Sequence, residues 1–228
     1  LFKEVIDRDD ESRFAAHALQ HLGRIAQSRG DHEQAASYFA KAGKHLPKEA
    51  AAASRFAEAQ SLLAAKQYPD AEKLFRACLK SSKDAARTSA IKAGLAIAVS
   101  RQDRTPEALK LLADVDLAAL DPATRDALRY ERAWCLKQLG KKDEAMIAYR
   151  ELIDGEGPPN PHAILELAVM HDDAGHRDEA AKLYANARDL ATKGDASNLR
   201  DIAEQASYRL GVCEYERGSF EASARLLG

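Results

Sequence analysis

Residues 19–47 read LQHLGRIAQSRGDHEQAASYFAKAGKHLP, and this stretch decides the fold class. It predicts two antiparallel helices, because Gly23 on the first and Ala35 on the second are small enough to lie where two helices cross closely. Larger apolar side chains would fill the space around that crossing: Leu19, Leu22 and Phe39. The stretch therefore predicts a closely packed helix pair.

The boundaries of the pair are also marked in the sequence. Gly30 supplies the permissive backbone that ends a first helix, and Asp31 can cap the start of the second. Pro47 ends the pair, because it has no N–H with which to continue a helix. The predicted unit is a helix-turn-helix of about this length.

The same unit recurs along all 228 residues. Alanines equivalent to Ala35 stand at positions 71, 108, 145 and 180, at intervals of 36, 37, 37 and 35 residues. We predict a half helix pair over 1–10, repeats over about 12–47, 50–83, 87–120, 123–155 and 160–192, and a partial repeat over 199–228. Irregular connections are expected at 155–161 (GEGPPNP) and 191–200 (ATKGDASNLR). No alternating Val/Ile/Thr-rich run predicts a strand, so the predicted fold is all-α.

The repeats resemble the tetratricopeptide repeat (TPR) family. Nine positions of 19–47 match its pattern: Leu19, Leu22, Gly23, Ala26, Gly30, Ala35, Phe39, Ala42 and Pro47. The resemblance implies a single right-handed superhelical solenoid of antiparallel helix pairs, with first helices lining a concave groove. Positions five and nine of each first helix would then face a protein or peptide partner: Gln20, Arg24, Phe56, Gln60, Ala93, Ile97, Tyr130, Trp134, Leu165, Val169, Tyr208 and Val212. The lone tryptophan, Trp134, could instead pack between repeats.

Charge and composition exclude several classes of partner. Lys plus Arg number 34 against 36 Asp plus Glu, with the signs interspersed, so neither nucleic acid nor an anionic membrane has electrostatic support as a partner. No apolar run is long enough for membrane insertion. The cysteines, Cys78, Cys135 and Cys213, are odd in number and widely spaced, which predicts buried apolar groups rather than disulfides.

Sequence motifs for catalysis or metal binding are missing, so we expect no enzyme, no cofactor and no metal site. Two histidine pairs have a spacing that could bind a metal ion or another cation. His17 and His21 lie four residues apart, as in a bidentate metal site, but no further ligand stands at helical spacing. His171 and His176 flank a turn that could hold a cation weakly. For the first pair we favour partly exposed histidines on a helix surface, and for the second a polar turn whose Asp residues are solvated near a helix end.

The leading functional hypothesis is a protein-interaction scaffold within a longer repeat protein. The alternatives are a structural spacer or self-assembling element of a larger complex, such as one of the bacterial envelope, and a docking domain of an enzyme whose catalytic part lies elsewhere. Self-association through truncated ends would use apolar side chains: Leu1, Phe2, Val5, Leu226 and Leu227. The Ala-rich composition resembles bacterial arrays, and the compartment, cytoplasm or periplasm, is not readable.

Overall fold

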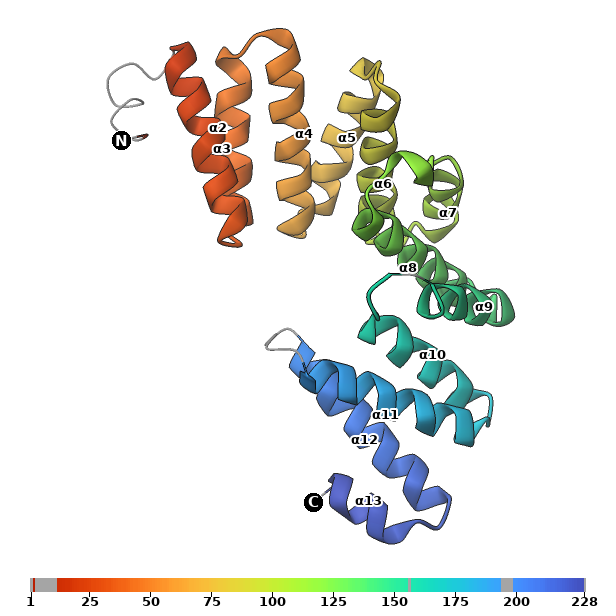
Figure 1. The fold of residues 1–228 in the computed structure, drawn as a ribbon. Helices are drawn as coiled ribbons and strands as arrows, with labels where there is room; N and C mark the ends of the chain where they lie inside the picture. The colour runs from red at the N-terminus through yellow and green to blue at the C-terminus, as the bar shows by residue number, and fades with distance from the viewer. Residues whose placement is uncertain (1, 3–11, 156, 194–198, 228) are drawn as a thin grey trace. The chain divides into compact units, whose positions relative to one another are not determined.

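The computed structural model describes residues 2, 12–155, 157–193 and 199–227, and this part of the chain is all-α (Figure 1). It contains α-helices and one 3-10 turn, η1, and no strand, so the predicted fold class is confirmed. The elements are α2 (Arg13–Ser28), α3 (His32–His45), α4 (Lys48–Ala64), α5 (Tyr68–Ser81), α6 (Ala85–Ser100), α7 (Thr105–Ala113), η1 (Leu117–Ala119), α8 (Pro122–Gln138), α9 (Lys142–Ile153), α10 (Pro161–Asp173), α11 (Arg177–Lys193), α12 (Arg200–Glu216) and α13 (Phe220–Leu227).

The chain divides into two compact units, Leu1–Thr124 and Arg125–Gly228. In the first unit, α2 to α7 pack mainly on their neighbours in sequence, and α4 also contacts α6. In the second unit, α10, α11, α12 and α13 pack in the same sequential way, and α10 contacts α12. The helices of these two series therefore bury their apolar faces against the helices just before and after them in sequence, as in an α/α repeat.

Small residues form the closest helix crossings. The five anchor alanines, at 35, 71, 108, 145 and 180, are all fully buried. Gly23 is needed for the same reason, because a Cβ atom there would lie 2.8 Å from the Phe39 ring. Gly94 likewise leaves room for the Phe75 ring. The predicted role of small residues at the crossings is confirmed.

One backbone conformation recurs at the turn inside every pair. A residue with positive φ stands there each time: Gly30, Lys66, Asp103, Gly140, Gly175 and Gly218, with φ between 60° and 80°. In the first pair, Gly30 N–H donates to Gln27 O at 3.0 Å and Asp31 N–H to Ala26 O at 2.9 Å, which is the Schellman arrangement. The turns of the other pairs share the first of these bonds.

Connections between pairs vary more than the turns inside them. After the short helix α7, the chain makes η1, with Asp116 capping it through a bond from Ala118 N–H, before α8 begins. Of the expected connection at 155–161, residues 155 and 157–160 are non-helical, and Asn160 caps α10 by accepting from Ala163 N–H at 3.2 Å. Of the expected connection at 191–200, α11 covers the first part up to Lys193, and 194–198 lie outside the described residues. The half pair over 1–10 lies outside them too, apart from Phe2.

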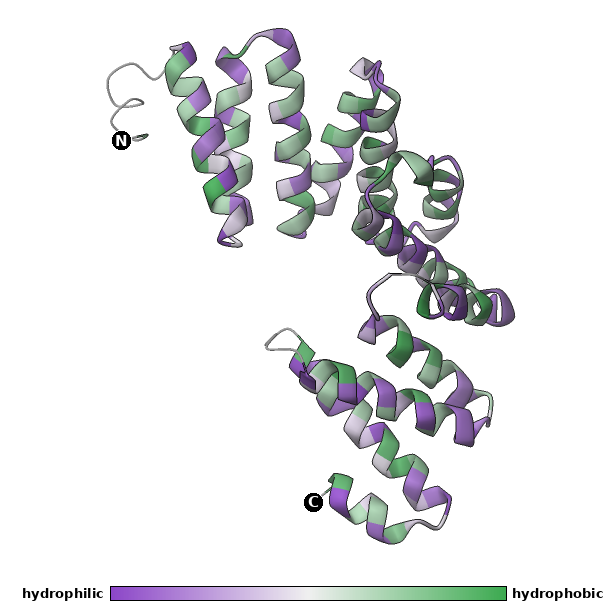
Figure 2. Cartoon of the chain, viewed as in Figure 1, coloured by the Kyte–Doolittle hydropathy of each residue, from purple (hydrophilic) through white to green (hydrophobic). Residues whose placement is uncertain are grey.

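Hydropathy alternates along the helices of both units (Figure 2). In the part of the chain that the structure describes, no helix combines the length and the apolar character required to cross a lipid bilayer.

Candidate partner-binding surface

In each unit the first helices of successive pairs are direct neighbours. Between α2 and α4, Gln27 Nε2 donates to Ser61 Oγ at 3.0 Å. Between α8 and α10, Lys137 Nζ pairs with Glu166 Oε2 at 2.5 Å. Gln27 and Lys137 stand at the same repeat position, eight residues before the anchor alanine. The same position thus links first helices side by side in both units.

In the first unit half of the candidate groove residues are polar, and all of them except Ala93 are at least partly accessible. Arg24 and Gln60 are exposed, and Gln20, Phe56 and Ile97 are half-buried. Gln20 Oε1 also lies 3.3 Å from His17 Nδ1. Ala93, taken from the same repeat pattern, is buried at 3% exposure, so α6 presents Ile97 rather than Ala93 at the surface.

In the second unit the candidate groove residues are apolar or aromatic. Tyr130 and Trp134 on α8 are half-buried, as is Val169 on α10. Leu165 is 9% exposed, whereas Tyr208 on α12 is 61% exposed. The accessible apolar area of this set therefore lies on α8, the second half of α10, and α12.

Two of the candidate aromatics also pack against their own repeat. Phe56 meets Phe75 edge to face, with ring centroids 6.1 Å apart, and Tyr130 meets Tyr149 in the same way at 5.8 Å. Both pairs are 19 residues apart, so the two contacts are equivalent. Tyr149 is fully buried, and burial raises the pKa of its hydroxyl well above the ordinary value. Phe56 and Tyr130, which lie on first helices, therefore also pack against the second helix of their own pair.

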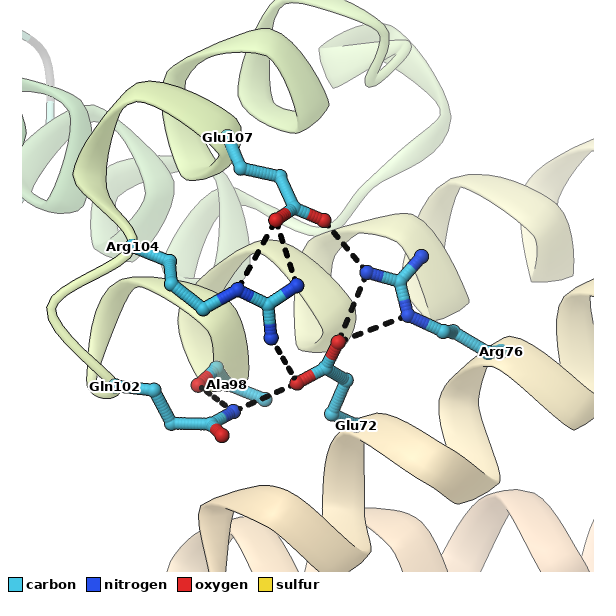
Figure 3. Close-up of polar contacts among 6 residues, drawn as sticks. All are labelled: Glu72, Arg76, Ala98, Gln102, Arg104 and Glu107. Carbon is cyan, nitrogen blue, oxygen red and sulfur yellow. Dashed lines mark hydrogen bonds and ion pairs between the residues drawn. The ribbon is translucent and has the colours of Figure 1, made fainter.

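Charged side chains join the second and third repeats in one network (Figure 3). Glu72 accepts from Arg76 at 2.9 Å, from Arg104 at 2.7 Å and from Gln102 at 2.8 Å. Glu107 accepts from Arg76 and from Arg104, each at 2.6 Å. Burial alone would raise the pKa of Glu72, but the hydrogen bonds from Arg104, Arg76 and Gln102 outweigh it and hold that pKa below its usual range.

The repeat pattern extends part of this network to the second unit. Arg150 and Glu179 stand where Arg76 and Glu107 do, relative to the anchor alanines, and they pair at 3.0 Å. Arg150 lies on α9 and Glu179 on α11, so the pair joins the second helices of successive repeats. These four side chains hold repeats together, and sequence reasoning missed them because each pair spans about 30 residues.

Asp172, at the end of α10 beside the turn considered as a weak cation site, is not solvated as expected, because protein groups surround its carboxylate. Its carboxylate lies 2.9 Å from Arg177 and 3.9 Å from Arg209, and it accepts a hydrogen bond from Tyr184 at 3.4 Å. Cys213 Sγ lies 4.0 Å from it. Burial first, and then the charge of Asp172, raise the pKa of the Cys213 thiol to about 11. This carboxylate joins α10 to α11 and α12.

The two histidine pairs differ in their surroundings. His171 Nδ1 is buried without a hydrogen-bond partner among the described residues, and burial lowers the pKa of this imidazole. His21 stacks on Phe2 with ring centroids 5.1 Å apart, and the rings of His171 and His176 lie 5.6 Å apart. Within the described ranges, no group of three or more His, Cys, Asp and Glu side chains is arranged to hold a metal ion. The three cysteines are free and buried, as predicted.

Of the apolar residues expected at the ends, Leu1 and Val5 lie outside the described residues. Leu227 is 48% exposed and Leu226 is half-buried. Leu227 packs against Gly211, where an added Cβ atom would lie 2.7 Å from its side chain. Part of its apolar surface is therefore already used to close the last helix pair.

Solved structures of other proteins share the fold. Pseudomonas aeruginosa PilF aligns with a TM-score of 0.68 at 19% identity, over 96% of this chain and 90% of that one. YrrB, described as a TPR protein with an unusual peptide-binding site, aligns with a TM-score of 0.55 at 17% identity, over 90% and 96%. MamA from Desulfovibrio magneticus RS-1 gives 0.61 at 15%, over 79% and 97%. At these identities the likeness concerns the fold alone.

Sequence comparison adds the family. No curated protein matches the chain in a direct search. Family models described as tetratricopeptide repeat match residues 18–51, 126–154, and 56–124 together with 165–228; the last two ranges make up more than half of the chain. The chain therefore belongs to the tetratricopeptide repeat family.

Proposed function

We propose that this protein is an interaction scaffold that binds a peptide segment of a partner protein along its first helices. Proteins of this family generally act as non-catalytic scaffolds, and a peptide-binding site is stated for the similarly folded YrrB. The observation that carries the proposal is the set of apolar side chains on α8, α10 and α12 in the second unit, which we call the second-unit groove: Tyr130, Trp134, Leu165, Val169, Tyr208 and Val212. All of them are accessible except Leu165, which is 9% exposed.

The chemistry of the second-unit groove favours a peptide with apolar side chains. Tyr208 leaves most of its ring in water, and Trp134 and Val169 are half-buried. Aromatic side chains that lie partly exposed on rigid helices are typical anchors of protein interfaces, because they bury a large area with little loss of conformational freedom. The neighbouring first helices, joined by Lys137–Glu166, provide that rigidity.

Trp134 makes the test direct, because it is the only tryptophan of the chain and its fluorescence reports on its surroundings. Random peptides displayed on phage would be selected on the intact chain, and the enriched peptides titrated while Trp134 emission is recorded. We expect Tyr208→Ala to weaken binding by about tenfold or more, as removal of an interface aromatic does.

The matched control is Ile147→Ala on the second helix α9, since Ile147 is 60% exposed and lies outside the groove set. Its affinity should equal that of the wild type. If no peptide is enriched, or if enriched peptides bind Tyr208→Ala as tightly as the wild type, the groove proposal fails. The spacer or self-assembly hypothesis would then lead, and sedimentation of the intact chain would test it.

A further inference from the structure

A cavity in the first unit shares no residue with the second-unit groove. Its volume is about 470 Å³, and it is formed where α5 ends and α6 begins, against the start of α4. Its apolar part consists of Phe56, which is half-buried, with Ile91 at 1% and Cys78 at 6% exposure. Burial raises the pKa of the Cys78 thiol, so this surface stays uncharged at neutral pH.

Positive charge surrounds this apolar surface. Five cationic side chains line the cavity: Lys48, Arg55, Lys80, Lys83 and Arg87. Two carboxylates, Glu49 and Asp84, also line it. Asp84 is already engaged, because its Oδ1 accepts the Arg87 backbone N–H at 2.7 Å as the N-cap of α6.

Among the described residues, none of the five cations is held in an ion pair, although Glu58, three residues after Arg55, interacts with it electrostatically. By contrast, Arg76 and Arg104 of the same unit are each bound to two carboxylates. The start of α4 adds to the positive potential, because its N-cap, Pro47, has no side-chain oxygen to accept from the first backbone N–H groups. A surplus of cations around an apolar cavity is complementary to an acidic ligand that carries an apolar group.

We propose that this cavity, the cationic pocket, binds an acidic peptide segment in which one apolar side chain is flanked by Asp or Glu. The apolar side chain would contact Phe56, Cys78 and Ile91, and the flanking carboxylates would pair with the surrounding Lys and Arg. A volume of about 470 Å³ is within the usual range for ligand sites and accommodates one large side chain with its backbone.

The inference is independent of the second-unit groove, so each can fail without the other. The probes are three fluorescently labelled synthetic peptides: one with a central Leu between Asp and Glu residues, one with Gly in place of that Leu, and one with Lys in place of the acidic residues. Fluorescence anisotropy with the intact chain at fixed ionic strength gives the dissociation constants. The acidic Leu peptide should bind about tenfold or more tighter than either of the others.

The pocket variant is Lys83→Glu with Arg87→Glu, two exposed positions whose side chains have no ion pair within the described part of the chain. Its matched control is Lys73→Glu with Lys110→Glu, two exposed lysines of the same unit outside the cavity. Both variants change the net charge by the same amount. We expect the pocket variant to lose about tenfold or more in affinity for the acidic Leu peptide and the control to stay within about twofold of the wild type.

Circular dichroism establishes that both variants are folded. If the pocket variant does not fold, Lys83→Gln with Arg87→Gln replaces it, and a smaller loss in the same direction is expected. Equal losses in pocket variant and control would show that only general charge attracts the peptide and would overturn the proposal. Equal affinity of the Leu and Gly peptides would also overturn it, since the apolar surface would then have no role.

Discussion

The recurring left-handed turn gives a quantitative prediction on stability. Four of the six turn positions are glycine, but Lys66 adopts the same conformation at φ 61°. A residue with a Cβ atom costs about 1–2 kcal/mol more than glycine in this conformation. Glycine offsets about 0.4–1 kcal/mol of this gain, because it increases the conformational entropy of the unfolded chain. The net stabilisation expected for Lys66→Gly is therefore about 0.5–1 kcal/mol.

Side-chain contacts around these turns are few, so the backbone conformation decides how a substitution changes the free energy of unfolding. Lys66 is exposed, and its side chain has no hydrogen bond or ion pair within the described residues. A Cβ atom added at Gly30 would meet no described atom within 4 Å. Gly30→Ala should accordingly destabilise by about the same 0.5–1 kcal/mol, through strain and not through a clash.

The assay is thermal and urea unfolding followed by circular dichroism. The melting temperature should rise by about 1–4 °C in Lys66→Gly and fall by a similar amount in Gly30→Ala. Lys66→Ala is the control, because alanine keeps the Cβ atom and should leave stability nearly unchanged. A gain in Lys66→Ala equal to that in Lys66→Gly would refute the reasoning, since the lysine side chain and not the turn would then be responsible.

Three further predictions concern the crossings and the charged network. Ala145→Leu should overpack a fully buried crossing and destabilise by about 1–3 kcal/mol; an unchanged melting temperature would contradict the assigned register. Gly94→Ala should lower the melting temperature, because its Cβ would collide with the Phe75 ring; no change would mean that the ring moves aside freely. The pKa of Glu72 is lowered in the folded state, so its stabilising contribution is complete above the ordinary pKa of an unfolded glutamate and is lost as the pH falls through the folded pKa. The free energy of unfolding, measured as the pH is lowered, should show this loss in the wild type and not in Glu72→Gln. Identical curves for the two proteins would show that Glu72 does not cause the pH dependence.

The sequence was sufficient to predict the fold class and the helix crossings because both depend on local patterns. Small residues at fixed intervals, such as Ala145, mark the crossings, and Gly30 marks a turn within a pair. Lys66 and Asp103 could not be assigned to left-handed turns from their residue types, since neither favours that conformation as glycine does. Their positive φ angles became evident only in the structure.

The surface was harder to predict because it depends on contacts between segments distant in sequence. Periodicity placed Phe56 and Tyr130 on the first helices, but their edge-to-face contacts with Phe75 and Tyr149 required the packing of the second helices. The cationic pocket is assembled from the starts of α4 and α6, the end of α5 and the loop between α5 and α6. No spacing rule joins such ends, and whether the candidate groove residues bind a partner stays a prediction.

The sequential packing has a consequence for synthesis of the chain. The principal contacts join each helix to the next one or, in α4 with α6 and α10 with α12, to the next but one. Such short sequence separations favour rapid folding, because little loop entropy is lost before a contact forms. A nascent chain could therefore complete each helix pair as it leaves the ribosome, without waiting for a distant segment. At any moment of translation, only the apolar surface of one or two incomplete helix pairs would then be exposed and able to aggregate.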